Sequence, residues 1–325
     1  MLPLSRRLAL AGLPLSRRLA VAGLPLSRRL AIAGLPLAAL AAARPLRAQG
    51  TPAELRFGMI SVENERDAVA RLQGFQAYVA QRLGMPVRVF RGTDYAAVVE
   101  ALRAGHAEFA YLGPASYALA RRVMGERIAP IFRYVDNQGL DGYHSVVIVK
   151  ADGPYRTVAD LKGRSIGWAD PNSTSGFQFP SYFLRKQGFD PATHFARTGF
   201  AGSHEQNVIA VLNGTFDCGA IAYSNERRNT FQRMEEKGMI PAGQIRVVWT
   251  SPLIPNSPVV LRQDLPEALK TRLTEALAAM PEADAEAFRA MSSGARGLTL
   301  ARHEDYLDVV AVVEENQQAR RQRRS

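Results

Sequence analysis

The sequence predicts an α/β protein with two lobes and two crossover segments. Strand-like runs such as "LRFGMI" and "VRVFRG" alternate with helix-like stretches of about ten to fifteen residues, which is typical of parallel α/β sheets. Two long extended stretches, "YHSVVIVKADGP" and "IRVVWTSPLIPNSPVVLR", bracket a central α/β block. The chain has 325 residues, which is enough for two cores of ordinary size.

These observations also predict where the lobes begin and end. We expect residues 54–145 together with 250–325 to form the first lobe, and residues 146–249 to form the second. Two segments between lobes make a hinge that can bend without unravelling either core. Ligands of α/β lobes bind beyond the carboxyl ends of the strands, where helices begin, so we expect a cleft shared by both lobes.

The first 48 residues have the layout of an export signal. An eleven-residue unit occurs three times, as "LPLSRRLALAG", "LPLSRRLAVAG" and "LPLSRRLAIAG", and an apolar run ending in "LRA" follows. The Arg28–Arg29 pair favours the twin-arginine route, and the general route stays open because no copy has the full consensus. Cleavage is expected after Ala48, and the alternative is an amphipathic N-terminal helix that is retained. The mature protein is therefore predicted to be periplasmic and soluble, with no lipid anchor and no membrane span.

The formal charge of +11 does not predict a nucleic-acid-binding protein. Residues 1–48 carry eight arginines and no acid, which leaves 33 basic against 30 acidic residues in the rest of the chain. The four arginines of the tail "ARRQRRS" are expected to form a frayed end, and they are Arg320, Arg321, Arg323 and Arg324. The single cysteine, Cys218, excludes an internal disulfide, and its apolar surroundings predict a buried side chain rather than a nucleophile.

Three consecutive hydroxyls, Ser173, Thr174 and Ser175, stand between the strand-like "RSIGWAD" and a predicted helix. A helix start has unpaired N–H groups and a partial positive charge, so these hydroxyls favour a compact anion such as phosphate or phosphonate. Gly176 is expected to let the backbone approach the ligand, and Asp170 and Asn172 to brace the turn. The alternative is an ordinary N-cap, which would need only one of the three hydroxyls. No cationic side chain is expected in the anion site.

Other predicted helix starts add candidate side chains to this site. Thr93 or Asp94 would cap a helix with Tyr95 in its first turn, and Ser203 with Gln206 fits a capping box that places His204 in the first turn. Tyr143 lies at the expected crossover. Gly113–Pro114 opens another helix, whose free N–H groups are expected to line the cleft.

Four stretches together resemble a known family. "DPNSTSGF", "SHEQNVIAVLNGTFD", "TDYAAVVEALRAGHAEFAYLGP" and "WTSPLIPNSPVV" are similar to the periplasmic phosphate/phosphonate-binding proteins of ABC importers, over about residues 54 to 280. The resemblance implies a type II periplasmic binding protein fold that closes on its ligand and presents it to a permease in the inner membrane. It implies no cofactor and no metal.

The resemblance also implies which side chains hold the ligand. The phosphorus oxygens would be bound by six residues, namely Tyr95, Tyr143, Ser173, Thr174, Ser175 and His204. Family members that take aminoethylphosphonate place acidic residues where this chain has Ser224 and Ser257. A ligand ammonium would be buried unpaired there, so the predicted ligand is phosphate, phosphite or an alkylphosphonate without an amine.

Two other functions remain open from the sequence. A hydrolase could use one of the serines with His204 and Asp170, although the chain has no G-x-S-x-G elbow and no zinc-binding motif. A sensory ligand-binding subunit can share the fold, and it would have to act as a detached partner. The favoured prediction is a monomeric substrate-binding protein without catalytic residues.

Overall fold

The structure is a computed structural model, and it describes residues 50–60, 65–226 and 228–323. Contacts divide the chain after Leu46, and every described residue belongs to the second unit, 47–325. The predicted export signal, 1–48, lies outside the described residues. No helix in the ranges that the structure describes is long and apolar enough to cross a membrane.

The first sheet has the strand order β13-β4-β12-β3-β1-β2. Its strands are β1 Leu55–Ile60, β2 Val87–Gly92, β3 Phe109–Tyr111, β4 Ile128–Val135, β12 Pro258–Arg262 and β13 Gly297–Leu300. Strand β1 pairs in parallel with β2 and β3, whereas β12 and β13 pair antiparallel with their neighbours. Strand β12 returns to this sheet without a preceding crossover helix, so it does not continue the parallel pattern.

The second sheet has the order β10-β5-β8-β6-β7, with β11 paired to β5 and β9 paired to β8. Its strands are β5 Gly142–Lys150, β6 Ser165–Trp168, β7 Arg197–Phe200, β8 Cys218–Asn225, β9 Arg228–Asn229, β10 Ile245–Thr250 and β11 Ile254–Pro255. Only the β6 pairs with β7 and β8 are parallel. Both sheets are therefore mixed, where the sequence predicted parallel sheets.

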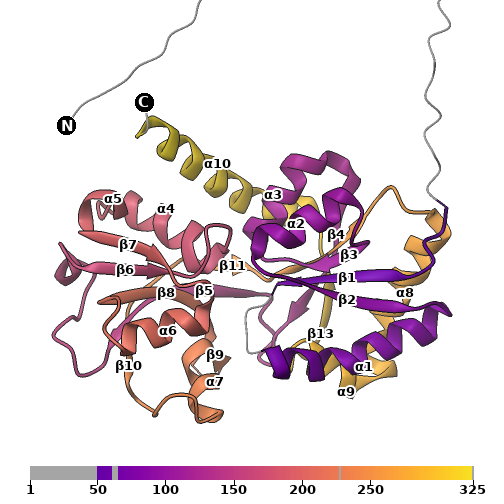
Figure 1. Ribbon diagram of the computed structural model, residues 1–325, viewed down its shortest axis with the longest axis horizontal. Helices are drawn as coiled ribbons and strands as arrows, with labels where there is room; N and C mark the ends of the chain where they lie inside the picture. Colours follow the sequence, from indigo (N-terminus) through magenta and orange to yellow (C-terminus); the bar gives the residue numbers. More distant parts are fainter. Residues whose placement is uncertain (1–49, 61–64, 227, 324–325) are drawn as a thin grey trace, which may run out of the picture. The chain divides into compact units, whose positions relative to one another are not determined.

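Helices cover both faces of each sheet (Figure 1). They are α1 Glu65–Leu83, α2 Tyr95–Ala104, α3 Pro114–Met124, α4 Phe179–Lys186, α5 Pro191–His194, α6 His204–Leu212, α7 Thr230–Glu236, α8 Glu267–Ala283, α9 Ala285–Met291 and α10 Leu307–Gln322. Four shorter helical turns are η1 Gly125–Arg127, η2 Ala159–Leu161, η3 Thr174–Gln178 and η4 His303–Tyr306. Burial of the apolar sides of these helices builds separate cores on the two faces of each sheet.

The chain passes between the sheets at two places. It leaves the first sheet after β4, at Val135, and enters the second with β5, at Gly142. It returns to the first sheet between the end of β10, at Thr250, and the start of β12. The extended stretch "IRVVWTSPLIPNSPVVLR" of the sequence therefore forms three separate strands, β10, β11 and β12. Tyr143 lies within β5, in the second sheet, ahead of the expected boundary at 146. The exact extent of the two lobes stays a prediction.

The C-terminal arginines do not form a frayed end where the structure describes them. Helix α10 runs to Gln322 and packs on α3 of the first sheet and α4 of the second, as Figure 1 shows. Arg320 lies over the Phe177 ring at 5.6 Å, and Arg323 pairs with Asp190 at 2.5 Å. These contacts place Arg320 against η3 and Arg323 against the residue that caps α5. Cys218 is fully buried, as predicted.

Candidate functional site: a polar cavity between the sheets

A cavity of about 190 Å³ lies where strands of both sheets end and helices begin. It is lined by Met59, Ile60, Tyr95, Tyr111, Gly113, Tyr143, Ser173, Thr174, Ser175, His204, Ala222, Ser224, Thr230, Arg233, Asn256 and Ser257. All six predicted ligand-binding residues and both predicted specificity positions are in this lining. The position beyond the carboxyl ends of β1, β3 and β6 agrees with the general rule for α/β folds.

The hydroxyl row forms the start of a helical segment, although its first turn is not an α-helix. Ser173 is the N-cap of the π-helical turn η3, and α4 continues from it. The Asp170 carboxylate accepts from the Asn172 N–H at 2.6 Å, and the Asp170 carbonyl accepts from the Ser173 N–H at 3.0 Å. Asp170 and Asn172 therefore brace the turn as expected, and a widened π turn is a frequent feature of functional sites.

The row does more than cap a helix. The Ser173 hydroxyl oxygen accepts from the Gly176 N–H at 3.0 Å, which is the ordinary capping bond. The Thr174 hydroxyl oxygen accepts from the Ala115 N–H of α3 at 2.8 Å, so it connects the two sheets. One of the N–H groups that this helix start was expected to offer to a ligand, that of Ala115, is thus already bonded. Each hydroxyl oxygen that accepts one bond keeps its own hydrogen, and both hydroxyls can still donate to an anion.

Gly176 is required by protein packing, whatever its expected part in the approach of a ligand. A Cβ atom at this position would lie 2.4 Å from the Ala169 Cβ, 2.8 Å from the Ser173 Oγ and 3.0 Å from the His204 Cε1. Two of these neighbours belong to the cavity wall itself. The missing side chain therefore allows the hydroxyl row and His204 to pack against one another.

The two tyrosines are neutral phenols held beside the row. Asp94, rather than Thr93, caps α2 by accepting from the Ala97 N–H at 2.8 Å, and this places Tyr95 in the first turn. Burial raises the pKa of Tyr95, and a hydrogen bond with Ser173 opposes part of that rise. Burial likewise raises the pKa of Tyr143, and hydrogen bonds with side-chain hydroxyls, including those of Thr174 and Ser175, oppose part of that rise. Both phenols are thus protonated at neutral pH and can donate to an anion.

His204 connects the hydroxyl row to strand β8. Its Nε2 lies 3.4 Å from the Ser173 Oγ, and its Nδ1 accepts from the Ala222 N–H at 3.2 Å. Burial, together with the positive charge of Arg233, lowers the pKa of His204 to about 4. The ring is therefore neutral at pH 7, and because Nδ1 is the acceptor, its hydrogen is on Nε2, toward the cavity.

This histidine geometry argues against the hydrolase alternative. A serine–histidine–aspartate triad needs an Nδ1–H group that donates to the aspartate. Here Nδ1 accepts from a backbone N–H, and the Asp170 carboxylate bonds within its own turn. In the part of the chain that the structure describes, no cluster of three or more His, Cys, Asp or Glu side chains could hold a metal ion.

Arg233 corrects the expectation that no cation faces the cavity. It belongs to α7, and its half-buried side chain is part of the lining. No carboxylate occurs among the lining residues that the structure describes. No local sequence pattern pointed to this arginine, because it lies in a polar helix, "TFQRMEE", far along the chain from the hydroxyl row.

Two further residues were missed because only tertiary contacts bring them to the site. The buried Ser145 hydroxyl of β5 donates to the Ser175 carbonyl at 2.6 Å and so holds the backbone of the hydroxyl row against β5. Asn256 lines the cavity and joins both crossing segments, since its amide donates to the Tyr134 carbonyl at 2.8 Å and its backbone N–H donates to the Asp141 carbonyl.

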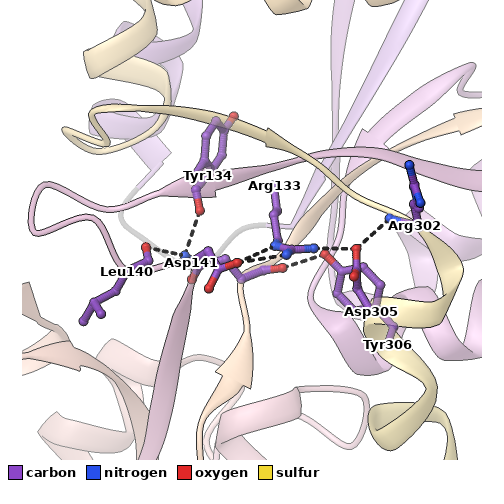
Figure 2. A network of polar contacts seen from close by, with 8 residues as sticks. Arg133, Tyr134, Leu140, Asp141, Arg302, Asp305 and Tyr306 are labelled. Carbon is purple, nitrogen blue, oxygen red and sulfur yellow. Dashed lines mark hydrogen bonds and ion pairs between the residues drawn. The ribbon is translucent and has the colours of Figure 1, made fainter.

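A polar network fixes this crossing region (Figure 2). Arg133 of β4 pairs with Asp141 at 2.8 Å and with Asp305 at 2.5 Å. The Tyr306 hydroxyl donates to the Asn256 carbonyl at 2.8 Å. Residues of both crossing segments and of the turn before α10 are thus held at one place, next to the cavity.

Two mixed α/β sheets joined by crossing segments, with a polar cavity at their strand ends, define a substrate-binding protein of the type II periplasmic binding protein fold. The chain belongs to the family described as "ABC transporter, phosphonate, periplasmic substrate-binding protein", whose model matches residues 57–306. Members of this family are substrate-binding proteins of ABC transporters and not enzymes.

Named relatives and a solved structure agree with this assignment. The phosphonates-binding periplasmic protein of Escherichia coli K12 is 32% identical over 234 residues, covering 70% of this chain and 67% of that protein. The phosphate-import protein PhnD of Mycolicibacterium smegmatis is 31% identical over 218 residues, covering 65% and 66%. PhnD1 of Prochlorococcus marinus, solved in complex with methylphosphonate, has the same fold, with a TM-score of 0.72 and 21% identity over 82% of this chain and 99% of that one. The chain thus spans about two thirds of the length of the two named sequence relatives.

Proposed function

We propose that this protein is the solute-binding component of an ABC importer and binds a small phosphorus oxyanion: phosphate, phosphite or an alkylphosphonate without an amine. The observation that carries the proposal is the convergence of six neutral donor side chains on one cavity. They are the residues predicted from the sequence, Tyr95, Tyr143, Ser173, Thr174, Ser175 and His204. Oriented neutral donors at a helical start hold an anion by geometry and partial charge.

The charges of the cavity favour an oxyanion over an aminated ligand. Its described lining contains the positive Arg233 and hydroxyls at Ser224 and Ser257, without a carboxylate. A ligand ammonium would lose water there without gaining an opposite charge. One similar protein is named for phosphonates, another is named for phosphate import, and a third was solved in complex with methylphosphonate. These similar proteins therefore do not point to one ligand.

We further propose that the two lobes close on the ligand. Tyr95 is on a helix of the first sheet, whereas the hydroxyl row and His204 belong to the second. An anion bound to both sides shifts the hinge equilibrium toward the closed state, because only that state allows all the contacts. The Thr174–Ala115 bond shows one contact that already exists across the two sides. The closed protein would act as a monomer in the periplasm, after removal of the export signal, and deliver its ligand to an inner-membrane permease.

Isothermal titration calorimetry tests the ligand class. We expect tight binding of at least one of phosphate, phosphite and methylphosphonate, and much weaker binding of aminoethylphosphonate. Ligand recovered unchanged after heat release would support binding without catalysis. Tight binding of aminoethylphosphonate would contradict the proposed role of Ser224 and Ser257, and no binding of any phosphorus oxyanion would contradict the function.

The hydroxyl row is tested by a double substitution. We expect Thr174→Ala with Ser175→Ala to weaken anion binding by about 2–4 kcal/mol, taking about 1–2 kcal/mol for each lost charge-assisted bond. Thr174→Ser is the matched control, because it keeps the hydroxyl that bonds Ala115. Near-native affinity of the double variant would show that the hydroxyls of Thr174 and Ser175 do not bind the anion.

A further inference from the structure

Helix α10 contributes a buried asparagine to the segment that carries the hydroxyl row. Asn316 is only 2% exposed, and its side-chain amide donates to two atoms of Gln178, the last residue of η3. These atoms are the backbone carbonyl oxygen and the side-chain Oε1, each at 2.8 Å. The Asn316 Oδ1 accepts from the Arg185 guanidinium of α4 at 2.9 Å. Both hydrogens and the oxygen of this buried amide are therefore used.

These partners allow only one orientation of the two amides. A backbone carbonyl can only accept and a guanidinium can only donate, so the nitrogen of Asn316 faces Gln178 and its oxygen faces Arg185. The Gln178 Nε2 in turn donates to the Pro171 carbonyl at 2.6 Å, which leaves its Oε1 to accept from Asn316. An ionised carboxylate of the same size at position 316 could accept from Arg185, but it could not donate to Gln178.

Gln178 closes the loop that carries the hydroxyl row. Its side chain reaches back to Pro171, before the row, and its backbone N–H donates to the Ser173 carbonyl at 3.0 Å. Like Asn316, Gln178 is buried, at 6% exposure. Loss of the Asn316 donors would leave two acceptors of Gln178 without their partner, and the residue that closes the loop would no longer be held in place.

Helix α10 is placed by both sheets, so Asn316 does more than attach it to α4. An apolar cluster joins α10 to helices of both sides, and it contains Val309 and Val313 of α10, Ala118 of α3 and Phe179 of α4. The network of Figure 2 holds the turn η4, just before α10, to strand β4 of the first sheet. The position of Asn316 is thus set by the first sheet as well as the second, and its bonds to Gln178 impose that position on the loop.

We propose that Asn316 is a positioning residue of the anion site, which acts through Gln178 on the hydroxyl row without touching the ligand. The proposal rests on the proposed function, since it assumes that the row binds the anion. A row of donors must keep its geometry closely, and a neighbouring side chain with complete hydrogen bonds is suited to hold it. Helix α10 lies beyond residues 57–306, which the family model matches, so family membership does not imply this contact.

Asn316→Leu tests the proposal, because leucine keeps the size of the side chain and removes its hydrogen-bonding groups. Phosphate, phosphite and methylphosphonate are titrated into the unmodified mature protein and into the variant by isothermal titration calorimetry. We expect the tightest of the three to bind Asn316→Leu more weakly, by a factor of about ten or more, because the loop no longer holds its donors at fixed angles. The stoichiometry distinguishes weaker binding from a loss of folded protein.

Tyr182→Phe is the matched control at the contact between α10 and α4. It removes the hydroxyl that donates to Glu315, the residue next to Asn316, at 3.1 Å, and it keeps the ring and the net charge. We expect it to bind the same oxyanion within about twofold of the unmodified protein. If Asn316 only attached α10, its loss would lower the free energy of unfolding and leave the affinity unchanged, as in this control.

Hydrogen exchange of the ligand-free protein gives a second readout, which follows the loop itself. The N–H groups of Gly176 and Gln178 are both bonded to Ser173, within the loop. We expect the segment 171–178 to exchange faster in Asn316→Leu, by a factor of about ten or more, and to keep its rate in Tyr182→Phe.

The outcomes separate this proposal from the proposed function. Near-native affinity of Asn316→Leu, or unchanged exchange of the segment, would overturn the positioning role and leave oxyanion binding standing. An equal loss of affinity in Tyr182→Phe would also overturn it, because the attachment of α10 would then be the cause. Failure of all three oxyanions to bind the unmodified protein would overturn both proposals. If Asn316→Leu does not fold, as judged by urea unfolding, Asn316→Asp decides, because it keeps the acceptor for Arg185 and loses the two donors.

Discussion

The two ends of the cavity differ in how they are built. The hydroxyl-row end consists of neutral donors within one short segment, Ser173 to Ser175, with tyrosines and a neutral histidine around it. The α7 end consists of single side chains from separate elements, Ser224 on β8, Arg233 on α7 and Asn256 between β11 and β12. Under the proposed function, the first end would bind the group that all phosphorus oxyanions share, and the second end would distinguish ligands of that class.

The difference has a physical reason. A tetrahedral oxyanion needs several donors at fixed angles, and a helical start supplies them from consecutive residues. Selection among ligands needs only one or two groups at the right place, which any neighbouring element can provide. Under the proposed function, we therefore expect substitutions at the α7 end to change which ligand binds without disturbing the hydroxyl row.

The largest effect on oxyanion binding is expected from Gly176→Ala, which displaces the donor side chains of the hydroxyl-row end. The added methyl group would overlap the Ala169 Cβ, at 2.4 Å, and press on the Ser173 Oγ and the His204 ring. Overpacking together with displaced donors should weaken oxyanion binding by about 3–5 kcal/mol. Calorimetry with the tightest of the three tested oxyanions measures the loss.

Gly297→Ala is the matched control for this substitution, because a Cβ there meets no atom within 4 Å. It should bind like the unmodified protein. Native-like affinity of Gly176→Ala would mean that Ala169 and His204 can move aside at little cost, and the rigid packing of this end would be refuted.

A second prediction concerns pH and the histidine that joins the two ends. The pKa of His204 is lowered from 6.5 to about 4, so the unfolded chain binds a proton that the folded chain does not accept between these values. The folded state therefore loses stability as the pH falls from 6.5 toward 4, by up to about 3 kcal/mol from this group. Urea unfolding at several pH values measures this loss.

His204→Asn isolates the contribution of the imidazole from that of the carboxylates. The asparagine amide oxygen can still accept from the Ala222 N–H, but the side chain does not titrate. We expect the free energy of unfolding of this variant to depend less steeply on pH over the same range. Parallel curves for the two proteins would show that burial and Arg233 do not lower the histidine pKa as described.

The contrast between a site built from consecutive residues and one built from separate elements also explains what the sequence could predict. The strand and helix runs of the first lobe region were predicted well, because each has its own periodicity, and "LRFGMI" and "VRVFRG" are indeed β1 and β2. The capping residues Asp94 and Ser203 were also within reach, since a cap is a local pattern. The hydroxyl-row end could be found for the same reason, together with the family resemblance.

The rest depended on contacts between distant residues. Arg233 looked like any arginine of a polar surface helix, and only the packing of α7 beside β8 turns it toward the cavity. The antiparallel strands β4, β12 and β13 follow from the paths of the crossing segments, which periodicity does not encode. The packing role of Gly176 could not be predicted, because its neighbours are Ala169, directly after β6, and His204 of α6 as well as Ser173 of its own turn.

The smallest effect is expected where the α7 end meets the crossing segments. Asn256→Ala removes the amide that donates to the Tyr134 carbonyl, and Tyr306→Phe removes the hydroxyl that donates to the Asn256 carbonyl. Each substitution should lower the free energy of unfolding by about 1 kcal/mol. Because both bonds hold the same residue, the double variant should lose less than the sum of the two single losses.

A double-mutant cycle by urea unfolding, with both single variants and the pair, measures this coupling. A coupling of at least about 0.5 kcal/mol would show that Asn256 is positioned through the network that also includes Arg133 and Asp305. Strictly additive losses would mean that the crossing segments hold Asn256 independently of the turn before α10. The α7 end would then be a collection of separate side chains, in contrast with the single preorganised segment at the other end of the cavity.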